Sequence, residues 1–330
     1  ADRFNEKRYL DSYVAKESGR ELRGEWYVLN TFLLAEDVSS AWDNWDVDAD
    51  LECKFADTAR LESRAVVSDG PVEYRVRSSY RLTEKSTLDQ DMIFYADRLG
   101  VVFETRMNWQ DEHRFLKTAF DTSIFTDTVR QEVQFGYIKR STNRNTSIEK
   151  AKFEVSNHKY SDLSEMRYGA AVLNDSKYGI GIEESKLRLS LHKGGNRPDT
   201  LGDKGIHSCV YAFLPHNGEF GTKNVIRPAY ELNYRPIITE GSLPLETFLE
   251  IEADNIIAEA VKPSEDGGRE YIVRLYEAEG ASAVTKVRAG KAVRIEETNM
   301  LEETTKEYGD GQEVTLTFRP FEIKTIRVLF

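Results

Sequence analysis

The chain has 330 residues, 40% of them hydrophobic and 11% aromatic, which is enough for two folded domains with a sizeable core. Its 57 acidic residues outnumber 45 basic ones, and the net charge of −12 argues against a duplex nucleic-acid partner, which needs a clustered cationic face. No apolar run approaches the ~20 residues that a membrane-spanning helix needs, so no membrane partner is expected.

Cysteine is scarce, with only Cys53 and Cys209 in the chain. Two cysteines do not form a disulfide framework, so we expect two buried free thiols in a reducing or redox-indifferent compartment. We therefore place the protein in the cytoplasm.

The first chemically suggestive segment is Trp42-Asp43-Asn44-Trp45-Asp46. One interpretation is an acidic surface loop whose two indoles pack on the core. The other is a sugar site, because aromatic faces stack on pyranose rings and carboxylates accept hydrogen bonds from vicinal hydroxyls. The residues alone leave both interpretations open.

The acidic residues continue at Asp48 and Asp50. Because they recur at every second position, Asp46, Asp48 and Asp50 are predicted to lie on one side of a strand. A calcium loop of the EF-hand type is excluded. Counted from Asp46, the sixth position is Leu51 where the loop needs Gly, and the twelfth is Asp57 where it needs Glu.

Alternating residues predict strands over 72–81, 103–109 and 115–120. In the first, Val72, Tyr74, Val76, Ser78 and Tyr80 are expected to share one face. The segment from Glu132 to Thr146 is polar and basic, and Lys139, Arg140 and Arg144 could bind an anion. We expect them instead to pair with the chain's many carboxylates.

The segment 153–179 mixes strand-like alternation with polar side chains that a strand does not need for folding. His158, Lys159, Tyr160, Ser161 and Asp162 can all form hydrogen bonds, so the segment is a candidate site. A second strand, 170–173, ends in a turn.

A long polar loop interrupts the alternating pattern of 187–192 at Lys193 and is expected to continue to the next strand, 209–214. Loops held on rigid strands are where binding residues concentrate, although a plain connection is as good an interpretation from the residues alone. The composition changes near Ser242, where we expect a domain boundary. Short alternating strands after it suit a small antiparallel sandwich.

Metal-binding patterns are missing from the sequence. The five histidines are far apart without HxH, HxxxH or HxD spacing, and there is no CxxC, so no zinc site is predicted in this chain.

Several long motifs carry a family resemblance. They are WDNWDVDADLE from Trp42, EVQFGYIKRSTNRNT from Glu132, FEVSNHKYSDLSE from Phe153, GAAVLNDSKYG from Gly169, LRLSLHKGGNRPD from Leu187, YAFLPHNG from Tyr211, and RLYEAEG and FEIKTIRV near the end. In this order they resemble the C-terminal β-domain of glycoside hydrolase family 38 alpha-mannosidases of the bacterial and cytosolic-type branch.

The resemblance implies an all-β fold. A large antiparallel β-sandwich, a supersandwich similar to galactose mutarotase, is expected over residues 1–241, followed by a small β-sandwich over 242–330. It also implies that the chain is the C-terminal, non-catalytic part of a zinc-dependent retaining alpha-mannosidase. Zinc and the acid and nucleophile carboxyl groups would then belong to an N-terminal catalytic domain, and this chain alone would be inactive.

The implied partners are that catalytic domain and a mannose-containing oligosaccharide, while homo-oligomer formation stays open. In relatives, the segment at 42–46 and the loop after 193 approach the sugar. The implied contacts are Trp42, Asp43, Trp45, Asp46, Arg197, Asp199, Asp203 and His207. Many relatives have a bulkier sequence where this chain has Gly194-Gly195-Asn196.

Two other functions stay open from the sequence. The chain could be a free-standing carbohydrate-binding module. It could also be a mutarotase-like epimerase that uses His158 or His207 with Asp162 as acid and base.

Overall fold

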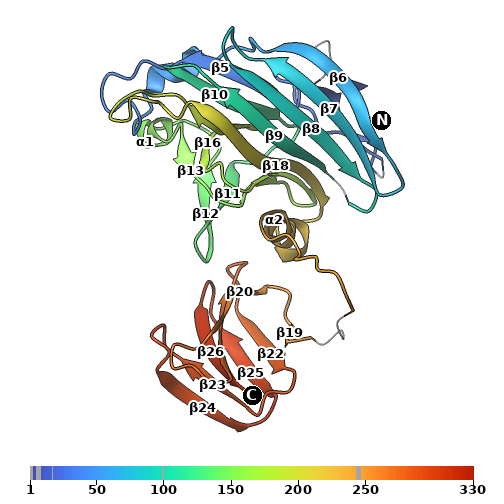
Figure 1. The fold of residues 1–330 in the computed structure, drawn as a ribbon, viewed down its shortest axis with the longest axis vertical. Helices are drawn as coiled ribbons and strands as arrows, with labels where there is room; N and C mark the ends of the chain where they lie inside the picture. The colour runs from blue at the N-terminus through green and yellow to red at the C-terminus, as the bar shows by residue number, and fades with distance from the viewer. Residues whose placement is uncertain (1–2, 5–8, 17, 99, 243–246) are drawn as a thin grey trace. The chain divides into compact units, whose positions relative to one another are not determined.

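The computed structural model describes residues 3–4, 9–16, 18–98, 100–242 and 247–330, and it divides the chain into two compact units (Figure 1). The large unit comprises Ala1–Glu132, Lys139–Phe220 and Pro228–Tyr234. The small unit comprises Val133–Ile138, Gly221–Arg227 and Arg235–Phe330. A division into domains at residue 242 stays a prediction.

The large unit is built on a nine-stranded antiparallel sheet with the order β12-β11-β14-β15-β18-β9-β8-β7-β6. Its strands are β6 (Arg60–Asp69), β7 (Glu73–Arg81), β8 (Thr87–Tyr95), β9 (Val101–Trp109), β11 (Thr128–Val133), β12 (Gly136–Ser141), β14 (Tyr160–Ser164), β15 (Tyr168–Asn174) and β18 (Gly205–Asn217).

A five-stranded antiparallel sheet, in the order β13-β16-β17-β10-β5, forms the second layer. Its strands are β5 (Thr31–Glu36), β10 (Arg114–Asp121), β13 (Val155–Ser156), β16 (Gly179–Glu183) and β17 (Lys186–Lys193). The apolar faces of both sheets contribute to one buried cluster, so the large unit is a β-sandwich.

Aromatic side chains fill the centre of this sandwich. Phe120 of β10 stacks on Phe213 of β18 with ring centroids 5.4 Å apart and planes 4° apart, and Phe103 of β9 stacks on Tyr211. All four rings are buried. The contact between Phe120 and Phe213 therefore joins the two sheets directly.

A hydrogen-bonded network lies within the same core. The Asn30 side-chain amide donates to Gln90 Oε1 at 2.6 Å, and Asn30 Oδ1 accepts from Thr118 and from the Tyr211 hydroxyl. Gln90 donates in turn to Thr105 Oγ1 and to the Tyr211 oxygen. Every member is buried and paired, which is the condition under which a polar group is tolerated in a core.

The predicted alternation is confirmed at β9, where Phe103, Thr105, Met107 and Trp109 are all buried. In β7 it is only partly right. Val76, Ser78 and Tyr80 are buried, but Val72 precedes the strand and is 69% exposed.

Shorter elements complete the large unit. They are β1 (Arg3–Phe4) with β2 (Leu10–Ser12), β3 (Val14–Ala15) with β4 (Arg20–Glu21), a 3-10 helix at Ala49–Cys53 and α1 (Ser147–Ala151). A π-helical turn at Thr222–Ile226 belongs to the small unit, while α2 (Arg227–Asn233) belongs, from Pro228 on, to the large unit. No described helix is long and apolar enough to cross a lipid bilayer.

Two sequence predictions for this region are wrong. The acidic residues from Asp46 to Asp50 do not lie on a strand, because Asp48 instead precedes the 3-10 helix and accepts a hydrogen bond from Ser40 N. Cys209 is a buried free thiol as expected, but Cys53 is exposed at the end of that helix.

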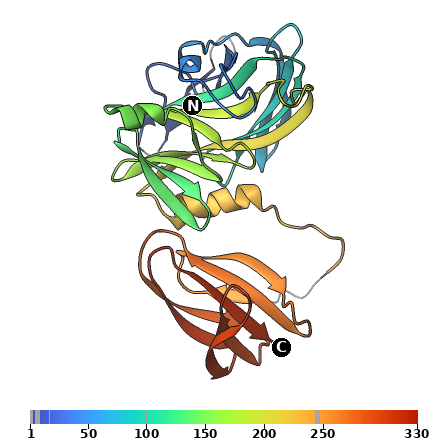
Figure 2. The same cartoon turned by 90° about the vertical axis from the view of Figure 1, so that its left-hand side faces the viewer.

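The small unit consists of two antiparallel sheets, ordered β19-β22-β25 and β20-β21-β26-β23-β24 (Figure 2). The strands are β19 (Leu249–Ile251), β20 (Ile256–Pro263), β21 (Glu270–Glu277), β22 (Ala283–Ala289), β23 (Arg294–Thr298), β24 (Thr304–Asp310), β25 (Glu313–Phe318) and β26 (Ile323–Leu329). Both sheets share one apolar cluster, and the predicted small sandwich is confirmed.

The buried carboxylate of Glu277 organises one end of the small unit. It accepts hydrogen bonds from the backbone N–H groups of Glu279, Gly280, Ala281 and Phe321 at 2.8–3.0 Å. These groups would otherwise be unpaired donors at the ends of strands, which gives a physical reason for the first of the two acidic residues in the motif RLYEAEG.

We expect Phe120→Ala to lower the free energy of unfolding of the large unit by about 3–5 kcal/mol, because it removes a buried ring from the contact between the sheets. Urea denaturation measures this change. Phe125→Ala is the control, since Phe125 is 83% exposed and its removal should change stability by less than about 0.5 kcal/mol. Equal losses in the two variants would contradict the assignment of the core.

Candidate functional site

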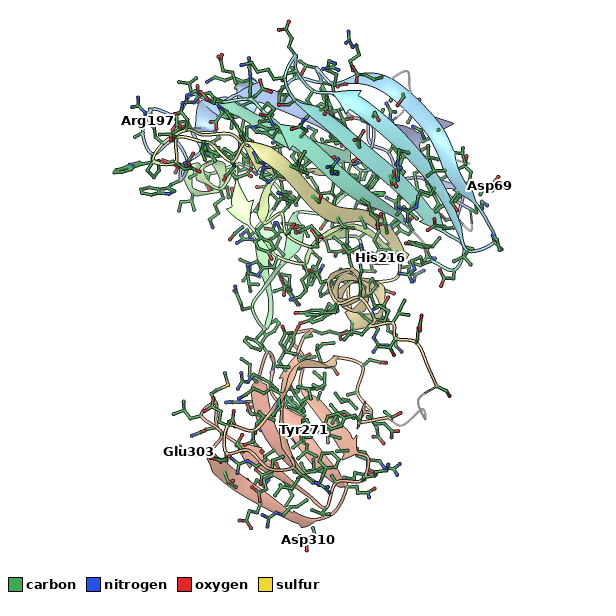
Figure 3. The ribbon with its side chains drawn as sticks, in the orientation of Figure 1. Asp69, Arg197, His216, Tyr271, Glu303 and Asp310 are labelled. Carbon is green, nitrogen blue, oxygen red and sulfur yellow. The ribbon has the colours of Figure 1, made fainter. Side chains whose placement is uncertain are left out.

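Two of the segments identified from the sequence meet at one end of the large unit. Asn44 N donates to Arg197 O at 3.2 Å, and Asn196 N donates to Asp43 Oδ2 at 2.7 Å. The loop at 42–46 and the loop after β17 therefore bind each other through one hydrogen bond between backbone groups and one to the Asp43 carboxylate. Figure 3 labels Arg197 at the margin of the large unit.

Lys193, the last residue of β17, reinforces this contact. Its Nζ donates to Asp43 O at 2.6 Å and forms an ion pair with the buried carboxylate of Asp37. A charge-assisted hydrogen bond in a half-buried position is stronger than an exposed one, so Lys193 anchors the 42–46 loop to the rigid sheet.

Glycine is required where the loops come closest. A Cβ on Gly194 would lie 2.6 Å from Trp109 Nε1, and one on Gly195 would lie 1.9 Å from Asn44 Oδ1. Gly202 has φ +61°, and its Cβ would lie 2.1 Å from Gly195 O. The sequence Gly194-Gly195-Asn196 therefore lets the backbone of this loop approach the 42–46 loop closely.

Asp43 holds the loops together in this arrangement. Its side chain is only 12% exposed, Oδ2 accepts from Asn196 N, and Oδ1 lies 3.5 Å from His113 Nδ1. Such a carboxylate has little surface to offer to a ligand, so its geometry suits positioning rather than direct contact.

The two indoles of the 42–46 loop do not pack on the core. Trp42 is 67% exposed and Trp45 is 73% exposed, and the rings stack on each other with centroids 5.7 Å and planes 18° apart. Trp42 has φ +58°, a left-handed conformation that is rare for a bulky residue. The interpretation in which both indoles are core residues is therefore wrong.

The remaining residues predicted to contact the sugar differ in exposure and in their hydrogen bonds. Asp46, Arg197, Asp199 and Asp203 are exposed, and Asp199 Oδ1 accepts from Leu201 N at 3.0 Å. His207 is half-buried, and its Nε2 lies 2.6 Å from Asp203 O. Strand β18 begins at Gly205, so His207 belongs to a strand and the polar loop is shorter than predicted.

A ring cluster below the loops was not predicted from the sequence. The ring centroid of His192 lies 4.6 Å from that of Trp109 and 4.4 Å from that of His207. Burial lowers the pKa of His192 to about 3, with a further contribution from the neighbouring His207. His192 is therefore neutral at physiological pH. The alternation of 187–192 places it on a face but does not reveal what the face contacts.

The polar segment around His158 does not form a catalytic pair with Asp162. Asp162 is fully buried, and its carboxylate accepts from Ser164 Oγ at 2.5 Å and lies 2.9 Å from His216 Nε2. His158 lies instead 3.5 Å from Glu132. His216 was not predicted because it is 54 residues from Asp162 in the chain.

Metal binding was tested on the geometry of the described residues. Among them, no three His, Cys, Asp or Glu side chains come together in a way that could hold a metal ion. The family resemblance itself assigns zinc to an N-terminal catalytic domain and not to this chain.

The protein-family comparison matches two models over most of the chain. The model described as "Glycosyl hydrolases family 38 C-terminal domain" matches residues 3–201, and "Glycosyl hydrolases family 38 C-terminal beta sandwich domain" matches residues 255–326. The chain belongs to glycosyl hydrolase family 38. The matched regions correspond to its C-terminal domains, which confirms the resemblance inferred from the motifs.

Curated relatives of this family 38 chain are alpha-mannosidases. It is 35% identical to human "Alpha-mannosidase 2C1" over 279 residues, covering 82% of this chain and 27% of the relative. It is 32% identical to "Alpha-mannosidase G" of Dictyostelium discoideum over 341 residues, covering 97% and 31%. The family 38 chain thus spans about a third of the length of these relatives.

A solved structure shares the fold. An alpha-mannosidase from Enterococcus faecalis V583 superposes with a TM-score of 0.76 at 16% identity, covering 99% of this chain and 41% of the other. At this identity the match shows the fold alone. It agrees with the all-β architecture of this family 38 chain.

His192 makes stability depend on pH. Its pKa of about 3 in the folded state lies below the ordinary value near 6.5, so the unfolded chain binds more protons between these values. Stability is therefore present above pH 6.5 and is lost as the pH falls toward 3, by at most about 1.4 kcal/mol per unit. Urea denaturation should show a steeper loss from pH 6 to 4 in the unmodified chain than in His192→Gln. Parallel curves would contradict this expectation.

Proposed function

We propose that this chain is the C-terminal, non-catalytic part of an alpha-mannosidase, supporting a catalytic domain and contributing contacts to a mannose-containing oligosaccharide. The family 38 models and the alpha-mannosidase relatives support the assignment. The free, exposed thiol of Cys53 agrees with a cytoplasmic location, because such thiols persist in reducing compartments.

The observation that carries the sugar contacts is the exposed pair Trp42 and Trp45, held on a loop that is itself anchored to β17. Their parallel rings present a flat apolar surface, which suits the C–H face of a pyranose. The loop is fixed by Lys193 and by the hydrogen bonds of Asp43 and Asn44. A preformed surface of this kind loses little conformational entropy when a ligand binds.

The predicted polar residues divide into two roles. We assign Asp46, Arg197, Asp199 and Asp203 to contacts with sugar hydroxyls, because their side chains are exposed on the 42–46 loop and on the loop after β17 that contacts it. Asp43 and His207 are assigned to positioning, because their polar atoms bind Asn196 N and Asp203 O.

Bond cleavage is assigned to the N-terminal catalytic domain of the longer enzyme. Retaining glycosidases need two carboxyl groups about 5–5.5 Å apart, one as nucleophile and one as acid and base. We place these groups and the zinc ion in that domain. This chain contributes orientation of the sugar and exclusion of water around it.

A hydrolysis assay tests the division of labour. We expect the 330-residue chain, supplied with Zn²⁺, to release no product from an aryl alpha-mannoside, while the longer enzyme hydrolyses it. Hydrolysis by the chain alone, surviving repeated purification, would overturn the proposal that this part is non-catalytic.

Substitution of one indole tests the sugar contact. We expect Trp45→Ala to weaken binding of a mannose oligosaccharide about five- to tenfold, because loss of a stacking face removes on the order of 1 kcal/mol. Titration followed by NMR measures the dissociation constant.

Trp26→Ala is the matched control, since Trp26 is also 73% exposed but lies away from the 42–46 loop. Trp26 N binds the side chain of Asp121, the last residue of β10. The glycine loop contacts the opposite end of this strand, where Gly194 N donates to Arg114 O. Removal of the Trp26 indole should leave sugar affinity unchanged. An equal effect of the two substitutions, or none for Trp45→Ala, would contradict a sugar site at the 42–46 loop.

A further inference from the structure

A basic cavity lies in the large unit, lined by residues of both of its sheets. It has a volume of about 330 Å³ and is lined by β11 and β12 of the nine-stranded sheet, β13 and β16 of the five-stranded sheet, and the segment of α1. Strands β12 and β13 are each the outermost strand of their sheets, so the cavity lies at an edge of the sandwich. None of its lining residues belongs to the loops of the sugar site.

Arg140 crosses the cavity between the two sheets. Its Nη1 donates to Gln131 Oε1 of β11 at 2.6 Å and to Ser156 O of β13 at 3.2 Å. Both acceptors are neutral, and no described carboxylate forms an ion pair with Arg140. Partial burial without an acidic neighbour lowers the pKa of this guanidinium. The side chain is therefore held in place while its charge stays uncompensated.

Other cations surround the same space. Lys139 and Lys152 line the cavity and make no ion pair with a described residue. Arg144 differs, because its Nη atoms bind the Glu52 carboxylate at 2.5 and 3.0 Å, although its Nε is buried without a hydrogen-bond partner. The expected pairing with carboxylates is thus confirmed for Arg144 and wrong for Lys139 and Arg140.

The one acidic side chain in the lining does not neutralise this charge. Glu149 Oε2 accepts from Thr146 N at 3.0 Å and from Thr146 Oγ1 at 3.1 Å, so it closes the first turn of α1. Lys139, Arg140 and Lys152 therefore lie at one cavity without a described carboxylate partner, although the chain as a whole has a net charge of −12.

We propose that this cavity binds a phosphate monoester of about monosaccharide size. Its phosphate would lie between Arg140, Lys139 and Lys152. These three positive charges suit a doubly charged phosphate better than they suit a singly charged carboxylate. The remainder of the ligand would lie against the apolar side chains of Ile148, Val155 and Ile182. The volume falls within the range of small-molecule sites.

Calorimetric titration of the full 330-residue chain tests the proposal with defined probes. A hexose 6-phosphate should bind saturably with one site per chain, and raising the salt concentration should weaken it. Inorganic phosphate should bind more weakly because it lacks the part that contacts the apolar wall. Glucuronate, a monocarboxylate, and unmodified mannose should bind at least about tenfold more weakly than the hexose phosphate.

Variants connect the signal to the cavity. Arg140→Gln should weaken hexose phosphate binding at least about tenfold, and Lys139→Ala about two- to fivefold. Lys150→Ala is the matched control, because Lys150 is an exposed lysine of α1 outside the cavity lining. This variant should bind the hexose phosphate as tightly as the unmodified chain does.

Thermal melting identifies variants that fail to fold. If Arg140→Gln unfolds, hexose phosphate binding is measured instead on the double variant Lys139→Ala with Lys152→Ala. Both lysines are exposed, so their removal should leave the fold intact. No saturable binding up to about 10 mM hexose phosphate would overturn the proposal. So would equal loss in Lys150→Ala, or glucuronate binding as tightly as the phosphate.

Discussion

The large unit depends on the buried hydrogen-bond network around Asn30, Gln90 and Tyr211, because it specifies how the two sheets face each other. Apolar rings tolerate small shifts, whereas each buried polar group left unpaired costs about 1–3 kcal/mol. Thr118 lies on one sheet, and Gln90 and Tyr211 lie on the other, so a displaced sheet would break several bonds at once. The ends of the strands are thereby held at fixed positions, and the loops that carry the candidate site begin from those ends.

Much of this architecture could be predicted because strand alternation is a local property. The pattern in 103–109 gave the correct buried face, and the long motifs indicated the family and its two-sandwich fold. The candidate site was predictable at the level of segments. The 42–46 loop and the loop between β17 and β18 do meet, although nothing in their spacing required it.

Individual roles were less predictable, because they depend on contacts between distant parts of the chain. Asp43 and Asp46 are the same residue type three positions apart, yet Asp43 accepts a hydrogen bond from the distant Asn196 N, whereas Asp46 accepts one from its neighbour Val47 N. Arg140 and Arg144 differ in the same way. Glu52, from the distant 3-10 helix, binds Arg144, whereas Arg140 binds the neutral groups of Gln131 and Ser156. Composition predicts that most cationic side chains pair with carboxylates. It does not predict which cationic side chain has no carboxylate partner.

The exposed indoles show why a rigid support matters for a surface of this kind. Two large apolar rings in water are unfavourable, and a mobile loop would allow them to fold back onto the protein. Lys193, Asp43 and the close approach at Gly195 restrict that freedom, and Trp42 and Trp45 stack on each other while staying largely exposed. Their remaining apolar faces are exposed to solvent. In the proposed sugar site, the ligand would not have to order this loop, so less conformational entropy would be lost on binding.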